Sequence, residues 1–348
     1  MKLSKKAILL FTMGLALATT GCGSGKGPEG VVAKVNDVEI SQDTYNTYYR
    51  IQRQQYVDYL GEETLNEVDE TGVKTYGQGL REYILENLIT QQVILNEAKK
   101  ENIDVSTEVE EQIKSEVDYL GADQFQEALK SMKLTEDAYR ELTRDNLVVS
   151  NYQENKMNTY EFSDDEINTY YESNKSSLQQ VRASHILVET EEEANNAIKR
   201  LEAGESFEDL AKELSIDTGS AVNGGVLGFF GKGVMVPEFE EYSFSGEVGA
   251  VSDPVKSQFG YHIIKITEKN DSAEGSREQI INALKAEKFQ ADLKALVDSA
   301  KIERFIDVTK EPESIKAELE AAAKEAETTE ETTEEKTEET TEEKPVTP

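Results

Sequence analysis

The chain has 348 residues, with 70 acidic and 37 basic side chains that give a formal net charge of −33, and it contains one cysteine and two histidines. The charge argues against a nucleic-acid-binding protein, because phosphates are recognised by an electropositive surface. A single cysteine excludes an internal disulfide framework and a cysteine-rich zinc site, and the length predicts two or three domains.

The N-terminus has the organisation of an export signal. Basic residues precede an apolar run from Ala7 to Ala18, which is too short to span a bilayer comfortably. The run ends in Thr-Thr-Gly-Cys at Cys22, which resembles a lipobox, the motif whose cysteine receives a diacylglyceryl group. We therefore expect a lipoprotein signal peptide over 1–21, lipidation at Cys22 and a flexible tether over 22–30. An ordinary signal peptide with an incidental cysteine is the alternative.

Residues 31–180 are expected to form a mainly helical N-terminal domain. The domain opens with a short hairpin whose turn is Asn36-Asp37, and Ser41 is the predicted N-cap of the first helix. Apolar residues recur at i and i+4 over 80–93, which predicts a largely buried helix. Further helix starts are predicted at Ser106, Thr135 and Ser163.

The helical pattern returns after the central part of the chain. Apolar residues along 273–301 form a stripe that needs a packing partner, so residues 270–310 are predicted to pack on the N-terminal domain, with the central module inserted. Two contiguous domains with a helical appendix are the alternative. Residues 311–348 carry 14 acidic and 4 basic side chains and predict a disordered acidic tail, in which 315–327 is compatible with a fraying, alanine-rich helix.

The central module, residues 181–269, differs from its flanks in composition. Ten of the 22 glycines lie in this module, whereas residues 29–236 contain no proline. Its pattern reads strand, helix, helix, strand, short helix, strand, with Pro237 at the start of the short helix. This order predicts an α+β domain of about 90 residues.

Four blocks follow one another in this module: Arg182–Val188, Ser220–Gly228, Met235–Glu240 and Phe259–Ile264. In this order they resemble the parvulin family of peptidyl-prolyl cis/trans isomerases. Together with the lipobox and the helical flanks, the whole chain resembles the PrsA foldase lipoproteins of Gram-positive bacteria. The expected fold is therefore an α+β parvulin domain inserted in a mainly helical, chaperone-like domain.

The chemistry that the resemblance implies needs no nucleophile. Rotation about an X–Pro amide has a barrier of about 18–20 kcal/mol, because amide resonance must be broken. An apolar slot for the proline ring, exclusion of water and polar groups that favour the twisted amide are sufficient. No cofactor and no metal are therefore expected.

The resemblance also implies roles for individual residues. Catalytic positions are expected at His185, Asp217 and His262, with the two histidines on neighbouring strands. The substrate-binding residues are expected to be Leu227, Met235 and Phe239 in the proline slot, and Phe259 and Tyr261 as wall or network members. Structural alternatives exist for several: a helix packing face for Met235 and Phe239, a core histidine for His185, and an Asx turn for Asp217.

Two positions depart from the family pattern. Val226 stands where the family often has Asp, and glutamates follow the first strand at 189 and 191–193 instead of an Arg/Lys pair. Recognition of a phosphoserine before proline requires cations, so we expect an isomerase that is not phospho-specific.

The resemblance implies an extracytoplasmic foldase, lipid-anchored at the cell membrane of a Gram-positive type of cell, that isomerises X–Pro bonds in exported proteins. Its expected partners are unfolded or partly folded exported proteins and the membrane, through the lipid anchor, but not nucleic acid. The apolar faces of the helical region leave a homodimer open. A non-catalytic holdase chaperone, with the parvulin core as a scaffold, is the alternative function. A wall-associated structural protein has only the anchor and the tail in its favour.

Overall fold

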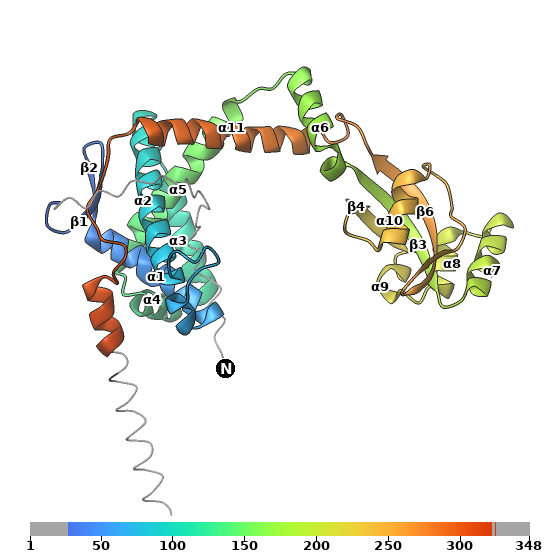
Figure 1. Cartoon of the computed structure of the whole chain (residues 1–348), viewed down its shortest axis with the longest axis horizontal. Helices are drawn as coiled ribbons and strands as arrows, with labels where there is room; N and C mark the ends of the chain where they lie inside the picture. The colour runs from blue at the N-terminus through green and yellow to red at the C-terminus, as the bar shows by residue number, and fades with distance from the viewer. Residues whose placement is uncertain (1–26, 322–323, 325–348) are drawn as a thin grey trace, which may run out of the picture. The chain divides into compact units, whose positions relative to one another are not determined.

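The computed structural model describes residues 27–321 and 324, and it divides into two compact units (Figure 1). Unit 1 contains the described residues up to Asn158 and those from Phe289 onward, and unit 2 contains Thr159–Lys288. The predicted signal peptide, Cys22 and most of the acidic tail lie outside the described residues. No helix within the described part of the chain is long and apolar enough to cross a membrane.

Unit 1 consists of helices and one small sheet. Its helical elements are α1 (Gln42–Leu60), η1 (Glu63–Asn66), α2 (Tyr76–Lys100), α3 (Ser106–Leu120), α4 (Ala122–Ser131), α5 (Glu136–Thr159) and the second half of α11 (Arg277–Ser299). Its antiparallel sheet has the order β2-β1-β7, from β1 (Val31–Val35), β2 (Val38–Ser41) and β7 (Ile302–Arg304). Because β7 pairs with β1, segments from before and after unit 2 meet in one sheet, so unit 1 is discontinuous in sequence.

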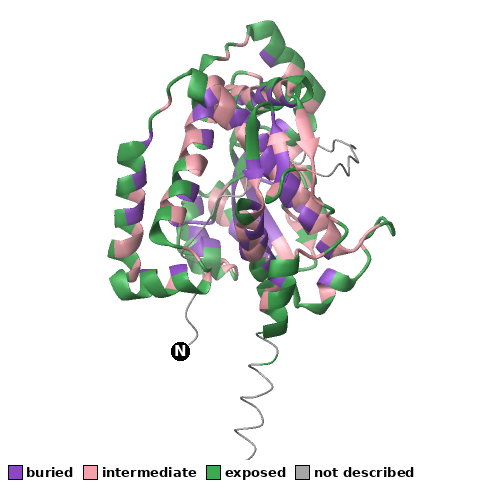
Figure 2. Ribbon diagram, turned by 90° about the vertical axis from the view of Figure 1, so that its left-hand side faces the viewer, coloured by how far each residue is buried: buried purple, intermediate pink, exposed green. Residues whose placement is uncertain are grey.

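The hairpin turn and the helix N-cap predicted at the start of unit 1 are present in the structure. Asn36 in the β1–β2 turn has a φ of 56°, a conformation that Asn tolerates better than most residues. The Ser41 side chain accepts a hydrogen bond from the Thr44 amide at 3.0 Å and caps α1. Helices of both units alternate buried and exposed residues along their length (Figure 2), as amphipathic helices do.

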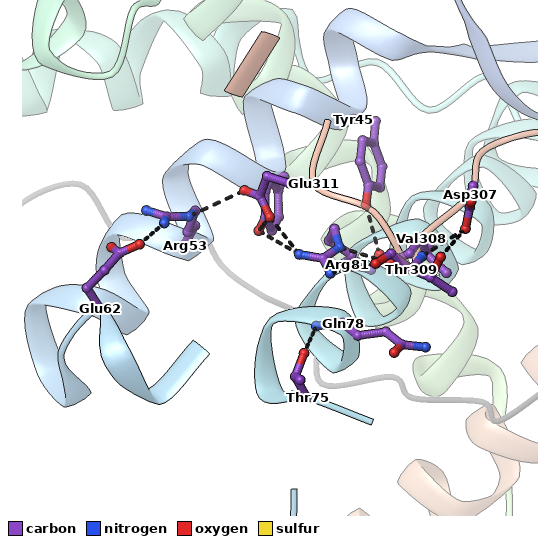
Figure 3. A network of polar contacts seen from close by, with 11 residues as sticks. Tyr45, Arg53, Glu62, Thr75, Gln78, Arg81, Asp307, Val308, Thr309 and Glu311 are labelled. Carbon is purple, nitrogen blue, oxygen red and sulfur yellow. Dashed lines mark hydrogen bonds and ion pairs between the residues drawn. The ribbon is translucent and has the colours of Figure 1, made fainter. Parts of the chain in front are cut away.

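After β7 the chain contacts α2 through a network of polar contacts, which Figure 3 shows. The Arg81 side chain, 8% exposed, donates from Nε to the Val308 carbonyl at 2.8 Å and from Nη1 to Glu311 Oε2 at 2.6 Å. The Arg53 side chain, 9% exposed, pairs with the other oxygen of the Glu311 carboxylate at 3.5 Å and also with Glu62. Glu311 is thus the carboxylate that both arginines share.

The segment after Glu311 is also packed on unit 1. Residues 313–321 are helical, and Ile315 is buried. Arg50 donates to both oxygens of the Glu318 carboxylate at 2.9 Å. Composition groups these residues with the predicted acidic tail, in which 315–327 is compatible with a helix; in the structure the first of them find a buried apolar position and arginine partners.

Unit 2 is a four-stranded antiparallel sheet with helices on both faces. The sheet order is β4-β3-β6-β5, from β3 (Gln180–Val188), β4 (Val226–Phe230), β5 (Val255–Ser257) and β6 (Gly260–Asn270). The helices are α6 (Asp164–Leu178), α7 (Glu191–Glu202), α8 (Phe207–Leu214), α9 (Thr218–Ala221), α10 (Pro237–Ser245) and the first half of α11. Unit 2 exceeds the expected 181–269 at both ends, because α6 and α11 share a core cluster around Tyr171 and Ile280.

Each face of the sheet has its own core. Helices α7 and α8 cover Ile186 and Ile263, whereas α10 covers the opposite face, where Ala183 and Ile264 are buried. Side chains alternate between the faces of a strand, so His185 in β3 and His262 in β6 both point to the α10 face. This arrangement brings the chain's two histidines together.

Gly225, just before β4, supports the strand that carries His185. It has a φ of 79°, its carbonyl accepts the His185 amide at 2.9 Å, and a Cβ at this position would collide with the His185 carbonyl. We expect Gly225→Ala to lower the free energy of unfolding of unit 2 by about 3 kcal/mol, as backbone strain and a steric clash add. Urea unfolding followed by circular dichroism measures the loss.

Gly228 is the matched control, because its φ is 73° but a Cβ there would meet nothing within 4 Å. Gly228→Ala should cost about 1 kcal/mol, the price of the left-handed conformation alone. Equal losses for the two variants would contradict the role assigned to the close approach at Gly225.

Candidate active site

The two histidines stack and share a hydrogen bond between β3 and β6. Their ring centroids are 5.4 Å apart with an interplanar angle of 18°, and the two Nδ1 atoms are 3.1 Å apart. Both residues are buried. The strand register explains the meeting, because His262 lies opposite Leu187, two residues from His185 on the same strand.

Asp217 and Ser220 complete the His185 end of this pair. His185 Nε2 lies 2.7 Å from Asp217 Oδ2 and 3.0 Å from Ser220 Oγ, and the Ser220 hydroxyl donates to the same carboxylate oxygen at 2.5 Å. The hydrogen bond from Ser220, followed by that from His185, holds the pKa of Asp217 below its usual value. Asp217 also accepts the Gly219 amide at 3.2 Å, so the predicted site residue and the alternative Asx turn coexist.

Ser257 completes the His262 end. Its hydroxyl lies 2.8 Å from His262 Nε2 and accepts the Phe259 amide at 3.1 Å. A continuous chain of hydrogen bonds therefore runs from Ser257 through both imidazoles to Asp217. We call these four residues and Ser220 the histidine relay.

The ionised Asp217 sets the direction of the hydrogen bonds in the relay. A carboxylate only accepts, so His185 must carry its proton on Nε2. In the form with neutral imidazoles, His185 Nδ1 then accepts from His262 Nδ1–H, and His262 Nε2 accepts from the Ser257 hydroxyl. The partly exposed Asp217 carboxylate thus selects the tautomers of both buried imidazole rings.

Phe239 in α10 packs against both histidines. Its ring meets His185 at a centroid distance of 5.7 Å and His262 at 5.3 Å, each with an interplanar angle of 81°. Leu227 and Met235 are partly buried and pack in the same cluster. The structure therefore brings together the three residues predicted for the proline slot, directly beside the relay.

Two predicted residues are placed differently. Phe259 is 58% exposed at the turn between β5 and β6, and the contact that it makes with the relay is through its backbone amide. Tyr261 packs with the α7 and α8 core, on the face of the sheet opposite the histidines. Its neighbour His262 occupies the site face, and adjacent strand residues point to opposite faces, so Tyr261 lies apart from the residues predicted for the slot.

Ser220 and Ser257 are the relay residues that sequence reasoning missed. Ser220 begins one of the recognised blocks, three residues after Asp217, the spacing at which one turn of α9 aligns the two side chains. Ser257 ends β5, a strand of three residues, which is too short to give a periodic signal. Within the described residues, no group of three or more His, Cys, Asp and Glu side chains is arranged to hold a metal ion.

The pKa of His262 gives the site a pH signature. Burial, and then repulsion from His185, lower this pKa from 6.5 to about 4. Between these values the unfolded chain binds a proton that the folded chain does not, so stability is complete above about pH 6.5 and falls as the pH drops towards 4. We expect the urea midpoint of unit 2 to decrease as the pH is lowered from about 6.5 to about 4.

His262→Gln removes the titrating ring and is the control for this measurement. The variant should be less stable at neutral pH, but its midpoint should change less between pH 6.5 and 4 than that of the parent. If the urea midpoint of His262→Gln fell with pH as steeply as that of the parent, the pH dependence would belong to other groups.

Comparison with known proteins agrees with this geometry. The family described as PPIC-type PPIASE domain matches residues 169–270, and the family described as SurA-like N-terminal domain matches residues 2–153. The "Foldase protein PrsA" of Caldanaerobacter subterraneus subsp. tengcongensis is 34% identical over 335 residues, which cover 90% of this chain and 99% of that relative. The chain belongs to the PrsA foldase family.

Other PrsA proteins give similar results. The "Foldase protein PrsA" of Halalkalibacterium halodurans is 38% identical over 226 residues, covering 64% of this chain and 67% of the relative. The crystal structure of peptidylprolyl isomerase (PrsA) from Bacillus anthracis is 32% identical and covers 62% of this chain and 94% of that chain, with a TM-score of 0.28. The predictions of a PrsA-type foldase, of its parvulin-type peptidyl-prolyl isomerase domain and of the mainly helical flanks are therefore confirmed.

Proposed function

We propose that this PrsA-family foldase isomerises X–Pro bonds of exported proteins in the slot formed by Leu227, Met235 and Phe239, with the histidine relay as its polar floor. The observation that carries the proposal is the direct packing of Phe239 on both relay histidines. We further propose that Cys22 is lipidated and holds the chain at the extracytoplasmic face of the cell membrane.

The slot favours the twisted amide through its low polarity. A planar amide is more polar than a twisted one, because resonance places negative charge on the carbonyl oxygen. A slot lined by Leu227, Met235 and Phe239 replaces water around the proline and removes the solvation that stabilises the planar form. The barrier to rotation is therefore lower in the slot than in water.

Asp217 adds an electrostatic contribution. Its side chain is 33% exposed while that of His185 is 7% exposed, so the carboxylate is the part of the relay that a bound peptide can approach. A negative charge near the substrate carbonyl disfavours charge on that oxygen and hence the planar resonance form. The buried histidines hold the carboxylate in place through His185 Nε2 and act as positioning residues.

Proline-limited refolding of an unrelated model protein tests this function. The full chain should accelerate the slow, proline-limited phase at substoichiometric concentration, and Asp217→Ala should reduce the acceleration by about tenfold to a hundredfold, equivalent to about 1.4–2.7 kcal/mol of transition-state stabilisation. Aggregation suppression, recorded separately, reports the alternative holdase function. Suppression without any acceleration of the proline-limited phase would overturn the isomerase assignment.

Lipidation has its own test. Expression of the full chain in a Gram-positive host should give incorporation of labelled palmitate that is lost in Cys22→Ser. An equally labelled variant, or an unlabelled parent, would contradict the anchor.

A further inference from the structure

The loop between α1 and α2 holds apolar side chains in solvent. Tyr59 and Leu60 end α1 and are 87% and 48% exposed, and Val68 and Val73 in the loop are 58% and 83% exposed. We call these four residues the α1–α2 patch. Solitary exposed apolar residues are ordinary, but several in the stretch that ends α1 and leads to α2 are typical of an interaction surface.

The loop that carries the patch is a fixed structure. The Gly61 amide bonds the Val57 carbonyl at 2.9 Å, and the Thr64 hydroxyl bonds the Leu60 carbonyl at 2.9 Å, which ties η1 to the end of α1. Further on, Val68 and Thr75 form a β-bridge. Because these bonds hold the apolar side chains outward before any partner arrives, binding there loses little conformational entropy.

The loop is also anchored to the core of unit 1 and to both of the helices that it joins. Leu65 in η1 is buried, and the Tyr76 amide at the start of α2 bonds the Glu67 carbonyl at 3.0 Å. The Tyr56 and Tyr76 rings meet at a centroid distance of 6.4 Å and join the last turns of α1 to the first turn of α2. The core of unit 1 therefore already uses Leu65 and leaves the patch residues outside.

Negative charge predominates in the stretch of chain that carries the patch. Residues 54–73 include six acidic side chains and no basic one: Asp58, Glu62, Glu63, Glu67, Asp69 and Glu70. The neighbouring cations are engaged, since Arg53 pairs with Glu62 and Lys74 pairs with Glu82. The patch also lies at the C-terminal end of α1, whose last turn has no basic residue and whose dipole attracts cations.

We propose that the α1–α2 patch binds basic, apolar segments of unfolded client proteins, separately from the isomerase slot. The apolar side chains supply the contact area, and the surrounding carboxylates select lysine- or arginine-containing segments. The same charge repels anionic lipid, so a protein segment fits this surface better than a membrane does. This inference rests on the proposed foldase function and names a client contact outside unit 2.

The binding test uses the full chain and a fluorescein-labelled, proline-free peptide of lysine, leucine and glycine, which the isomerase slot has no proline to recognise. Fluorescence anisotropy should report binding that weakens with salt. The same peptide with glutamate in place of lysine should bind at least about tenfold more weakly. A Tyr59→Ser/Val73→Ser variant should lose about tenfold in affinity for the lysine peptide.

Tyr119→Ser is the matched control, because Tyr119 is 81% exposed elsewhere on unit 1, at the end of α3. It should bind the lysine peptide like the parent, and all variants should isomerise a short X–Pro peptide at the parental rate. Equal affinity of parent and patch variant, an equal loss in Tyr119→Ser, or a patch-dependent preference for anionic phospholipid vesicles over the peptide would overturn the proposal. Absence of isomerase activity in the parent would instead contradict the proposed function, and the binding measurement with the proline-free peptide could still be interpreted.

Discussion

Phe239→Ala is expected to reduce kcat/KM for an unphosphorylated X–Pro peptide by roughly 100-fold, equivalent to about 2.7 kcal/mol of transition-state stabilisation. The substitution removes one wall of the proposed slot and the ring that meets His185 and His262 edge-on. It also leaves a cavity, because Phe239 is 2% exposed, so unit 2 should lose about 3–5 kcal/mol of unfolding free energy. Peptide isomerisation and urea unfolding measure the two effects separately.

Phe229→Ala is the control for this prediction. Phe229 lies in β4 of the same unit but is 45% exposed, where it meets the Arg182 guanidinium. Its removal should change stability by less than about 1 kcal/mol and leave kcat/KM unchanged. Phe239→Leu, which keeps apolar volume, should fold more stably than Phe239→Ala and remain less active than the parent. Full activity in Phe239→Ala would show that the slot lies elsewhere.

Glu311→Ala is expected to destabilise unit 1 by about 3 kcal/mol. The carboxylate pairs with Arg81 and Arg53, whose side chains are 8% and 9% exposed, and it accepts the Tyr49 hydroxyl at 2.8 Å. Removing one partner leaves the other charges desolvated without their counter-ion, which costs far more than breaking an exposed pair. Urea unfolding of the full chain, followed by circular dichroism, measures the loss.

Glu110→Ala provides the exposed comparison within the same unit. Glu110 pairs with Arg140, but the Glu110 side chain is 66% exposed, so its removal should cost less than about 1 kcal/mol. Combining Arg81→Met with Glu311→Met should recover part of the stability that Glu311→Ala loses, because no charge of this pair stays buried alone. A cost for Glu311→Ala no larger than that for Glu110→Ala would contradict the structural role of the returning segment.

Positions expected from the sequence agree with the structure where several local rules lead to the same result. The motif blocks placed His185 and His262 on strands, and strand pairing then brought them together in β3 and β6. The Asn36 turn, the Ser41 cap and Pro237 at the first position of α10 follow from single-residue chemistry that no tertiary contact opposes.

Other placements depend on geometry beyond the local pattern. Tyr261 was expected near the slot because of the family resemblance, and the period of two in a strand directs its side chain to the face opposite His262. Residues 311–321 were grouped with the tail by composition. Glu311 is bound by Arg81, which lies more than 200 positions earlier in the chain. Ile315 is buried by packing that a local stretch of sequence does not contain. Ser257 joined the relay through a three-residue strand that only its pairing with β6 defines.

The most direct test of the central claim is exchange spectroscopy on a short, unphosphorylated X–Pro peptide with catalytic amounts of the full chain. Cis/trans exchange of the uncatalysed bond is slow, on the order of tens of seconds. We predict exchange cross-peaks between the cis and trans resonances with the parent and with Phe229→Ala, but not with Phe239→Ala. Absence of exchange with the parent, or equal exchange with Phe239→Ala, would contradict isomerisation in the slot beside the histidine relay.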